Sequence, residues 1–414
     1  MRNMESGRFP PEPKINVAIV AHPASPPGPA GGAEMFSGIL ADSLQDKGPF
    51  KIRVYGHNNP AYPFQPGIEY VACGPSADAI IETSGGSDAE ATKIAAVNIS
   101  HRLAEDLSES MTRRNGEKWV VIDNNITTAS LATFLALDGI PHILIQHEFI
   151  EKNLFNIYKQ LVASGSKVVS VADFQRRTVE ERFGAIHDVT IKNGVPSRNI
   201  QLQPRPSIDN GIRVGTLSNI EVNDKKGVRF ACEATKKLSE WEHPVTLSIA
   251  GAVNDRTYFY EVIQPYIDKG LAKYVGLVGP EPEDKSRYLG KLHVGSALSN
   301  PGSWNEATQT FEGNFEEQSS LVIPEMMMHG VVPVSTDSGG AESLADAGLN
   351  NLIVPLSVLE KQGKEIFINL AAKTMLEAAT NPVSREELRA RVRTADNMGR
   401  EYADYLMKLL GRQL

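Results

Sequence analysis

Two glutamates, Glu317 and Glu325, enclose seven residues at the edge of an apolar stretch and are the side chains most suggestive of chemistry. A helix is predicted to begin at Ser319 or Ser320, because serine caps helices well and Pro324 is tolerated only near a helix start. Free backbone amides from Ser319 to Leu321 could hold a diphosphate, and the Glu325 carboxylate could accept hydrogen bonds from paired ribose hydroxyls. Paired glutamates also hydrolyse glycosidic bonds, but eight helical residues rise about 12 Å, against ~5 to 9.5 Å for hydrolytic pairs. The hydrolytic alternative therefore stays open only if Glu317 lies in a loop.

Three other places carry residues that could bind or react. Gly31 and Gly32 stand directly before a predicted helix, where bare backbone amides can approach an anion or a sugar. His147 follows a buried strand and could hydrogen-bond a substrate hydroxyl or transfer a proton near neutral pH. Lys226, beside Lys225, lies near a helix N-terminus, where positive charge is locally unfavourable unless an anion is bound. Each also has an ordinary structural explanation: an unusual backbone turn, a hydrogen-bonded loop histidine, and a solvated lysine pair.

The elements that must position these residues alternate between strand and helix. Residues 15–21 (INVAIVA) are a continuous apolar run, typical of a strand buried on both faces of a parallel sheet, and a glycine- and proline-rich loop leads from it into a helix. Similar strands follow as KIRVYG, WVVID, PHILIQH, KVVSVA and VTIKNGV. Such alternation predicts a parallel, doubly wound α/β sheet.

The pattern breaks after Val195 and then begins again. Residues 197–210 are rich in proline and lack periodicity, which is typical of a domain linker. We therefore expect an extended or disordered N-terminus (1–14), an N-terminal domain (15–196), a linker (197–210), a C-terminal domain (211–390) and a helix (391–414) that could pack back on the N-terminal domain. Ser299 to Phe315 reads as an inserted loop.

Composition narrows the function classes. The chain has 414 residues, 41% apolar and 22% charged, with a net charge of −8, which argues against nucleic-acid phosphates as the main partner. Its two cysteines, Cys73 and Cys232, support neither a disulfide framework nor a cysteine-based zinc site. The N-terminus lacks a secretory signal and no stretch of about 18 apolar residues occurs. We expect a cytoplasmic protein whose membrane association is at most peripheral.

The order of these pieces resembles the retaining glycosyltransferases of family 4, which have the GT-B fold of two Rossmann-like domains facing across a cleft. The resemblance runs from about Ile15 to Leu388 and rests on the following matches: Gly31 to Glu34, His147, Asn193 to Val195, Lys226 with Gly227, Glu317 and Glu325 ahead of Gly330, Val331 to Val334, and Gly339 with Gly340.

The resemblance implies transfer of a sugar from a UDP- or GDP-sugar to a hydroxyl of an unknown glycan, lipid or small-molecule acceptor, without metal or cofactor. It implies that Glu325 holds the ribose, and that Glu317 with the amides of Ser319, Ser320 and Leu321 meets the donor sugar and diphosphate. Lys226 would neutralise phosphate, His147 would contact the transferred sugar, and Gly31 and Gly32 would line the phosphate side of the cleft.

The sequence departs from the family pattern in several places. Thr216 stands where the family has an arginine, and Ser319 and Ser320 replace its Phe-Gly. One alternative is therefore a degenerate GT-B protein that binds a sugar nucleotide or a partner without transfer. Another is an epimerase or phosphorylase, although the context of a pyridoxal-binding lysine is missing and the spaced glutamates fit a transferase better.

Overall fold

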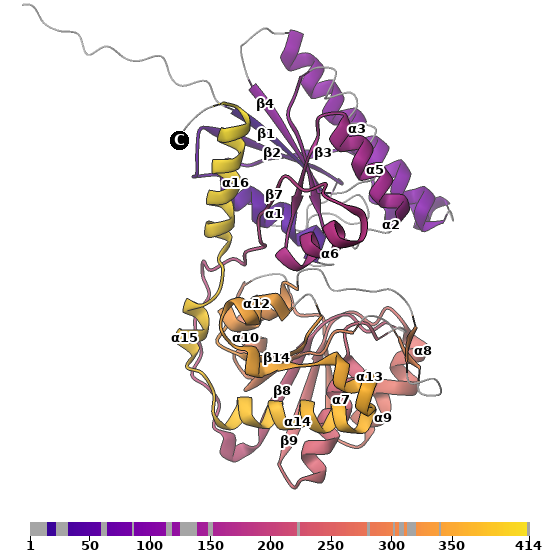
Figure 1. Cartoon of the computed structure of the whole chain (residues 1–414), viewed down its shortest axis with the longest axis vertical. Coiled ribbons are helices and arrows are strands. Elements are labelled where there is room, and N and C mark those ends of the chain that lie inside the picture. The colour runs from indigo at the N-terminus through magenta and orange to yellow at the C-terminus, as the bar shows by residue number, and fades with distance from the viewer. Residues whose placement is uncertain are drawn as a thin grey trace, which may run out of the picture.

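The computed structural model describes residues 15–21, 32–58, 64–84, 87–112, 118–124, 139–147, 152–221, 224–279, 282–300, 303–305, 310–312, 320–338 and 341–411. These residues form two α/β domains stacked end to end (Figure 1).

The first domain is built on a parallel sheet of strand order β3-β2-β1-β4-β5-β6-β7 within the described ranges. The strands are β1 (Ile15–Val20), β2 (Phe50–Gly56), β3 (Glu69–Ala72), β4 (Lys118–Asp123), β5 (His142–Gln146), β6 (Lys167–Ser170) and β7 (Val189–Thr190). β1 is buried throughout, as its apolar run predicts. The strand order reverses between β1 and β4, and in open parallel sheets ligands bind beyond the carboxyl ends of the strands at such a reversal.

Helices cover both faces of this sheet. They are α1 (Gly32–Leu44), α2 (Ala77–Ser84), α3 (Asp88–Thr112), α5 (Lys152–Ala163), α6 (Asp173–Phe183) and, from the far end of the chain, α16 (Ala395–Leu409). Phe36 and Leu40 of α1 share one buried core with Tyr402 and Leu406 of α16. α3 covers the opposite face, where Leu103 packs in a second core.

The second domain repeats the design with the order β10-β9-β8-β11-β14-β15 in its described part. Its strands are β8 (Ile212–Leu217), β9 (Val245–Ala250), β10 (Ala272–Gly276), β11 (Val294–Ala297), β14 (Val332–Thr336) and β15 (Ile353–Val354). Its helices are α7 (Val228–Glu240), α8 (Arg256–Tyr258), the π-helical turn η3 (Phe259–Ile263), α9 (Gln264–Asp268), α10 (Pro282–Leu289), α11 (Val322–Met328), α12 (Glu342–Asp346), α13 (Leu356–Gln362), α14 (Lys364–Thr380) and α15 (Arg385–Ala390). The strand order again reverses beside the first strand, between β8 and β11.

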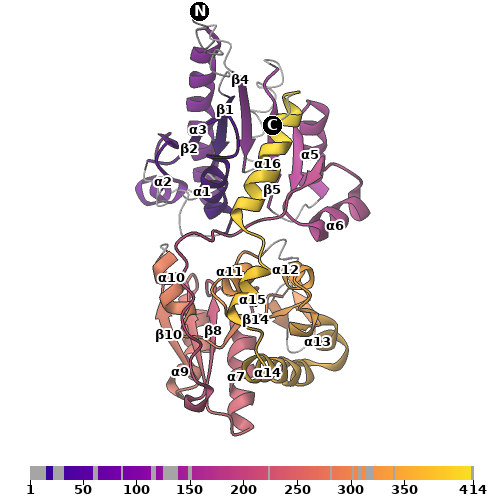
Figure 2. The same cartoon turned by 90° about the vertical axis from the view of Figure 1, so that its left-hand side faces the viewer.

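The chain crosses between the domains twice, and the two crossings are hydrogen-bonded to each other. Val195 and Thr394 form a parallel bridge, in which the amide of Ala395 donates to the carbonyl of Val195 at 2.8 Å. Gly194 allows this approach, because a Cβ there would lie 2.3 Å from the carbonyl oxygen of Thr394. Figure 2 shows the second crossing rising from α15 to α16.

The structure confirms two doubly wound parallel α/β domains and changes several details. The expected helix start at Ser319 or Ser320 is wrong: α11 begins at Val322. Leu321 takes the N-cap position, and its side chain packs against the core of the second domain. The segment expected to be an inserted loop contains an antiparallel hairpin, β12 (Ser303–Asn305) with β13 (Thr310–Glu312). In the described ranges, no helix is long and apolar enough to cross a bilayer.

Candidate active site

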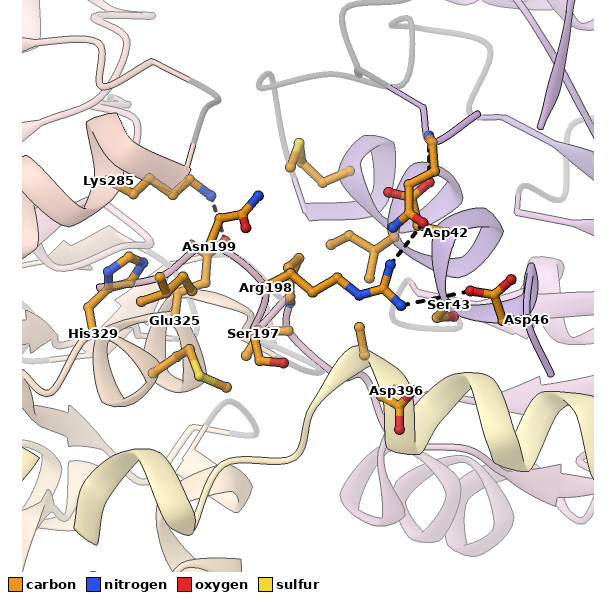
Figure 3. A pocket seen from close by; sticks show the side chains of 18 of the residues that line it. Asp42, Ser43, Asp46, Ser197, Arg198, Asn199, Lys285, Glu325, His329 and Asp396 are labelled. Carbon is orange, nitrogen blue, oxygen red and sulfur yellow. Dashed lines mark hydrogen bonds and ion pairs between the residues drawn. The ribbon is translucent and has the colours of Figure 1, made fainter. Parts of the chain in front are cut away.

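A cavity of about 280 Å³ lies between the two domains (Figure 3). Its walls come from α1, the first crossing, the start of α16, and the helices α10 and α11: Met35, Ile39, Asp42, Ser43, Asp46, Lys47, Gln65, Val195 to Ile200, Lys285, Glu325, Met328, His329, Ala395 and Asp396. Ligand pockets usually enclose about 300 to 1,000 Å³. The cavity therefore suits part of a nucleotide-sized ligand.

Glu325 projects into this cavity from the first turn of α11. A carboxylate is stabilised at that position because the helix N-terminus carries partial positive charge. The ammonium group of Lys285, from the first turn of α10, donates to its Oε1 at 2.6 Å (Figure 3). Both side chains are largely buried, at 18% exposed for Lys285 and 14% for Glu325. In the described residues, Oε2 of Glu325 accepts no second bond from protein, so this oxygen can receive a ligand hydroxyl.

His329 lies beside this ion pair and is held neutral. It is 4% exposed, and its Nδ1 lies 3.2 Å from the hydroxyl of Ser286. Burial lowers the pKa of His329 to about 4, and the nearby positive charge of Lys285 acts in the same direction. The imidazole therefore adds no positive charge to this wall at neutral pH.

The opposite wall carries a charge network that joins the first domain to the crossing. Arg198 donates to Oε1 of Gln65 at 2.8 Å and lies 4.0 Å from a carboxylate oxygen of Asp46. Lys47 pairs with Asp396 at the start of α16. These contacts tie α1 to both crossings and fix the shape of the cavity on that side.

Lys226 and Gly227 lie at the strand-order reversal of the second sheet, before α7. The side chain and backbone amides of Asn300, beyond β11, donate to the carbonyls of Asp224 and Lys225 at 2.8 and 3.0 Å. Gly227 has a left-handed φ of +66°, and a Cβ there would lie 1.9 Å from the carbonyl oxygen of Leu298. Only glycine fits this approach, which places Lys226 at the reversal.

A carboxyl group of the protein itself, that of Asp224, already occupies the N-terminus of α7. Both carboxylate oxygens of Asp224 accept from the amide of Arg229, at 3.3 and 3.2 Å. Burial raises the pKa of the Asp224 carboxyl to about 7, and these amides only partly oppose that shift. A phosphate near this helix would therefore depend on the Lys226 side chain more than on the α7 amides.

Of the remaining predicted residues, the four that the structure describes (His147, Gly32, Ser320 and Leu321) do not line the cavity. His147 follows β5, half-buried, with its ring edge-on to Phe36 of α1 at 4.6 Å between ring centroids. Gly32 is the first residue of α1, Ser320 is 9% exposed, and Leu321 packs against the core of the second domain. Gly31, Glu317 and Ser319 lie outside the described residues.

The position of Thr216, where the family has an arginine, has no room for a larger side chain. It is 2% exposed in β8, and its hydroxyl lies 3.0 Å from that of Ser218. Its carbonyl accepts a hydrogen bond from the hydroxyl of Tyr288 at 2.8 Å. An arginine here would have to displace packed atoms, so the position is filled rather than vacant.

Sequence reasoning missed Lys285 and a contact made by Glu342. The Glu342 carboxylate crosses from α12 to the first domain and accepts the amides of Asp173 and Phe174, at 3.1 and 3.2 Å, at the N-terminus of α6. Lys192 joins this contact through Asp346 at 2.7 Å. The sequence signal for Glu342 was its position after Gly339 and Gly340, whereas Lys285 stands among acidic residues and gave none.

Comparisons with known proteins show which family model and which solved structures this chain resembles. Residues 211–364 match the family model described as Glycosyl transferases group 1. No curated protein sequence matches the chain. The solved structures that resemble it include HepE from Anabaena in complex with UDP and glucose, at TM-score 0.62 and 14% identity over 95% of this chain and 99% of that one. The chain has the GT-B fold.

Two other GT-B structures show the same likeness. The lipopolysaccharide outer core galactosyltransferase WaaB, without ligand, has TM-score 0.62 and 11% identity over 95% of this chain and all of that one. The α,α-trehalose 6-phosphate synthase from Burkholderia multivorans has TM-score 0.61 and 14% identity over 96% and 99% of the two chains. The interdomain cavity with Glu325 is thus part of the cleft between the two halves of a GT-B fold. Among the described side chains, no group of three or more His, Cys, Asp or Glu could hold a metal ion.

Proposed function

We propose that the chain is a retaining family 4 glycosyltransferase that moves a sugar from a UDP- or GDP-sugar to an acceptor hydroxyl without a metal ion. The observation that carries the proposal is the Glu325 carboxylate in the interdomain cavity, within the part of the chain that matches Glycosyl transferases group 1. HepE, a structural neighbour at 14% identity, is described with UDP-glucose, which supports a nucleotide sugar as donor. We propose the cytoplasm as its location, with at most peripheral membrane contact.

On the donor side, Glu325 would receive a ribose hydroxyl at Oε2 while Lys285 holds Oε1. Lys226 would place one positive charge near the diphosphate, and the amides of Ser319, Ser320 and Leu321 would add hydrogen-bond donors. Cleavage of the sugar–phosphate bond leaves negative charge on the diphosphate and positive charge on the sugar ring. Positioned donors and cations lower the energy of that charge separation.

On the sugar side, His147 and Glu317 would contact the transferred sugar, with Gly31 and Gly32 lining the phosphate side of the cleft. The departing phosphate oxygen would take the proton of the acceptor hydroxyl as the new bond forms on the same face of the sugar. Retention then needs no separate basic side chain. The half-buried position of His147 against Phe36 suits an orienting role.

The test is incubation of the purified protein with UDP-glucose, UDP-galactose, UDP-N-acetylglucosamine and GDP-mannose, with and without EDTA. We expect release of UDP or GDP from at least one donor, unaffected by EDTA, and slower release by Lys226→Ala than by Lys225→Ala, since Lys225 pairs with Glu221 at 3.0 Å. The anomeric configuration of any transferred sugar can be read by NMR. Binding of a nucleotide without release from any donor, with candidate acceptors present, would contradict the transferase.

The second candidate is a GT-B protein that binds a sugar nucleotide or a partner without transfer. Two observations favour it: Thr216 is buried where the family has an arginine, and Lys285 occupies one oxygen of Glu325. The same incubation separates the two, because this protein would bind UDP or GDP and leave every donor intact.

A further inference from the structure

Part of one face of the second sheet carries no helix in the described structure. α7, α9 and α14 cover the other face, while α11 packs on β11 and β14. Leu289, at the end of α10, and Leu292, just after it, share a core with Met326 of α11. This follows from the topology: after the edge strand β10 the chain passes to β11, on the far side of β8. The face of β9 and β10 is left as the floor of a groove.

The groove has a volume of about 870 Å³ and a strongly one-sided charge. Its lining includes five cationic side chains and one carboxylate: Arg213, Lys269, Lys273, Arg287, Lys291 and Asp284. Asp284 pairs with Arg287 at 3.1 Å. No described carboxylate pairs with the other four cations, and three of these, the lysines, are exposed. The whole chain has a net charge of −8, so this concentration of positive charge is local.

The floor of the groove offers hydroxyl groups as well as apolar surface. Thr246 and Ser248 of β9 present hydroxyl groups, and Lys273 lies beside Ser248 in the sheet register. Val275 and Leu277 are exposed apolar side chains of the lining, and Val275 shares its sheet face with Lys273. An amphipathic helix would need a continuous apolar floor, which Lys273 interrupts, and a flat bilayer would not enter a groove. The lining runs along the whole of β10, from Lys269 to Gly279, and the five residues of this strand alone span about 16 Å. This length suits an extended, chain-like polyanion, and the hydroxyl groups of β9 suit one that is itself rich in hydroxyl groups.

The groove also adjoins a cavity that reaches toward the cleft between the domains. This cavity of about 580 Å³ shares the lining residues Arg213, Arg287 and Lys291 with the groove and shares Asn199 with the interdomain cavity. A row of neighbouring hollows thus runs around α10 from the interdomain cavity to the open sheet face. We propose that this groove binds an acidic polysaccharide, whose hydroxyls meet β9 and whose carboxylates or sulfates meet the lysines. Only the further step, that this bound chain is the acceptor or product, rests on the proposed transferase function.

The experiment measures binding of polygalacturonate fragments to the full chain without any donor, by calorimetry at low and at physiological ionic strength. We expect salt-sensitive binding that the double variant Lys273→Glu/Lys291→Glu weakens at least tenfold. The matched control is Lys361→Glu/Lys373→Glu, which changes the net charge equally at exposed positions of α13 and α14, on the other side of the sheet. Equal melting temperatures of the three proteins verify folding.

Neutral dextran, polyglutamate, single-stranded DNA and anionic phospholipid vesicles serve as competing probes. Absence of polygalacturonate binding, equal binding of dextran, tighter binding of any of the other three, or equal weakening by the control variant would overturn the proposal. Nucleotide-sugar turnover is measured separately. Turnover without polygalacturonate binding removes the groove proposal alone, and binding without turnover removes the transferase alone.

Discussion

Removing the Glu325 carboxylate should weaken nucleotide binding by a predictable amount. Because Lys285 holds Oε1 at 2.6 Å, one oxygen is left for a ribose hydroxyl. A charge-assisted hydrogen bond contributes about 1.5 to 3 kcal/mol, and about 1.4 kcal/mol corresponds to a tenfold change in Kd. Glu325→Ala should therefore raise the Kd for UDP or GDP roughly ten- to hundredfold. Because the ion pair is largely buried, removing Glu325 also leaves Lys285 without its counter-charge, which should cost the fold about 3 kcal/mol.

Calorimetric titration with UDP and with 2′-deoxy-UDP tests the assignment to ribose. The wild-type protein should prefer UDP, and Glu325→Ala should lose that preference, because the bond to the missing hydroxyl no longer exists in either complex. Glu365→Ala is the matched control, since Glu365 also lies in the first turn of a helix, α14, but is exposed and outside the cavity. If Glu325→Ala binds UDP as tightly as the wild type, or keeps the preference for UDP, then Glu325 does not bind the ribose.

Three other substitutions test the remaining parts of the reasoning. His147→Ala should lower kcat about ten- to hundredfold and leave the Kd for UDP unchanged. Steady-state kinetics measures kcat and calorimetry measures the Kd; an unchanged kcat, or a higher Kd for UDP, would contradict this role. The pKa of His329 is lowered from 6.5 to about 4 in the folded protein, so below pH 6.5 this residue binds protons more readily in the unfolded chain than in the folded one. The free energy of unfolding should therefore fall as the pH falls from 6.5 toward 4, by at most about 1.4 kcal/mol per pH unit. Urea denaturation across this range should show a shallower loss for His329→Gln, and an identical slope would rule out the histidine as its source. Gly227→Ala should cost about 2 to 5 kcal/mol of unfolding free energy, whereas Gly270→Ala, with φ +72° and nothing within 4 Å of its Cβ, should cost only the backbone part; equal losses would mean that the carbonyl contact at residue 227 does not matter.

The strands were predictable from sequence because a strand buried on both faces of a parallel sheet has to be apolar at every position. β1 is one such run, and each of its residues is buried. β3 and the helices α2 and α3 were not predicted. β3 is an edge strand of four residues with one buried position, so its sequence lacks the continuous apolar run.

The candidate site was predictable only where a single segment carries the signal. Glu325 stands out because the helix start and the glutamate lie together in sequence. Lys285 comes 40 residues earlier and meets Glu325 only when α10 and α11 pack side by side. The sequence shows only that Thr216 stands where the family has an arginine; whether that position is open or filled depends on the atoms packed around it, and Thr216 is 2% exposed. The cap that Glu342 places on α6 depends on how the two domains meet, which no local pattern encodes.

The position of α16 has a consequence for how the chain is made. Met398, Tyr402 and Leu406 complete the core that Phe36 and Leu40 begin, so of these two domains the one that is synthesised earlier is the last to acquire its full interior. The second domain has all the strands that the structure describes in it once residue 354 has emerged, and it can close while the other domain still exposes the apolar side of α1. A nascent chain of this protein therefore carries an unfinished domain through most of its synthesis, and shielding of that surface from other chains, rather than the speed of folding of either sheet, should limit its yield in the cell.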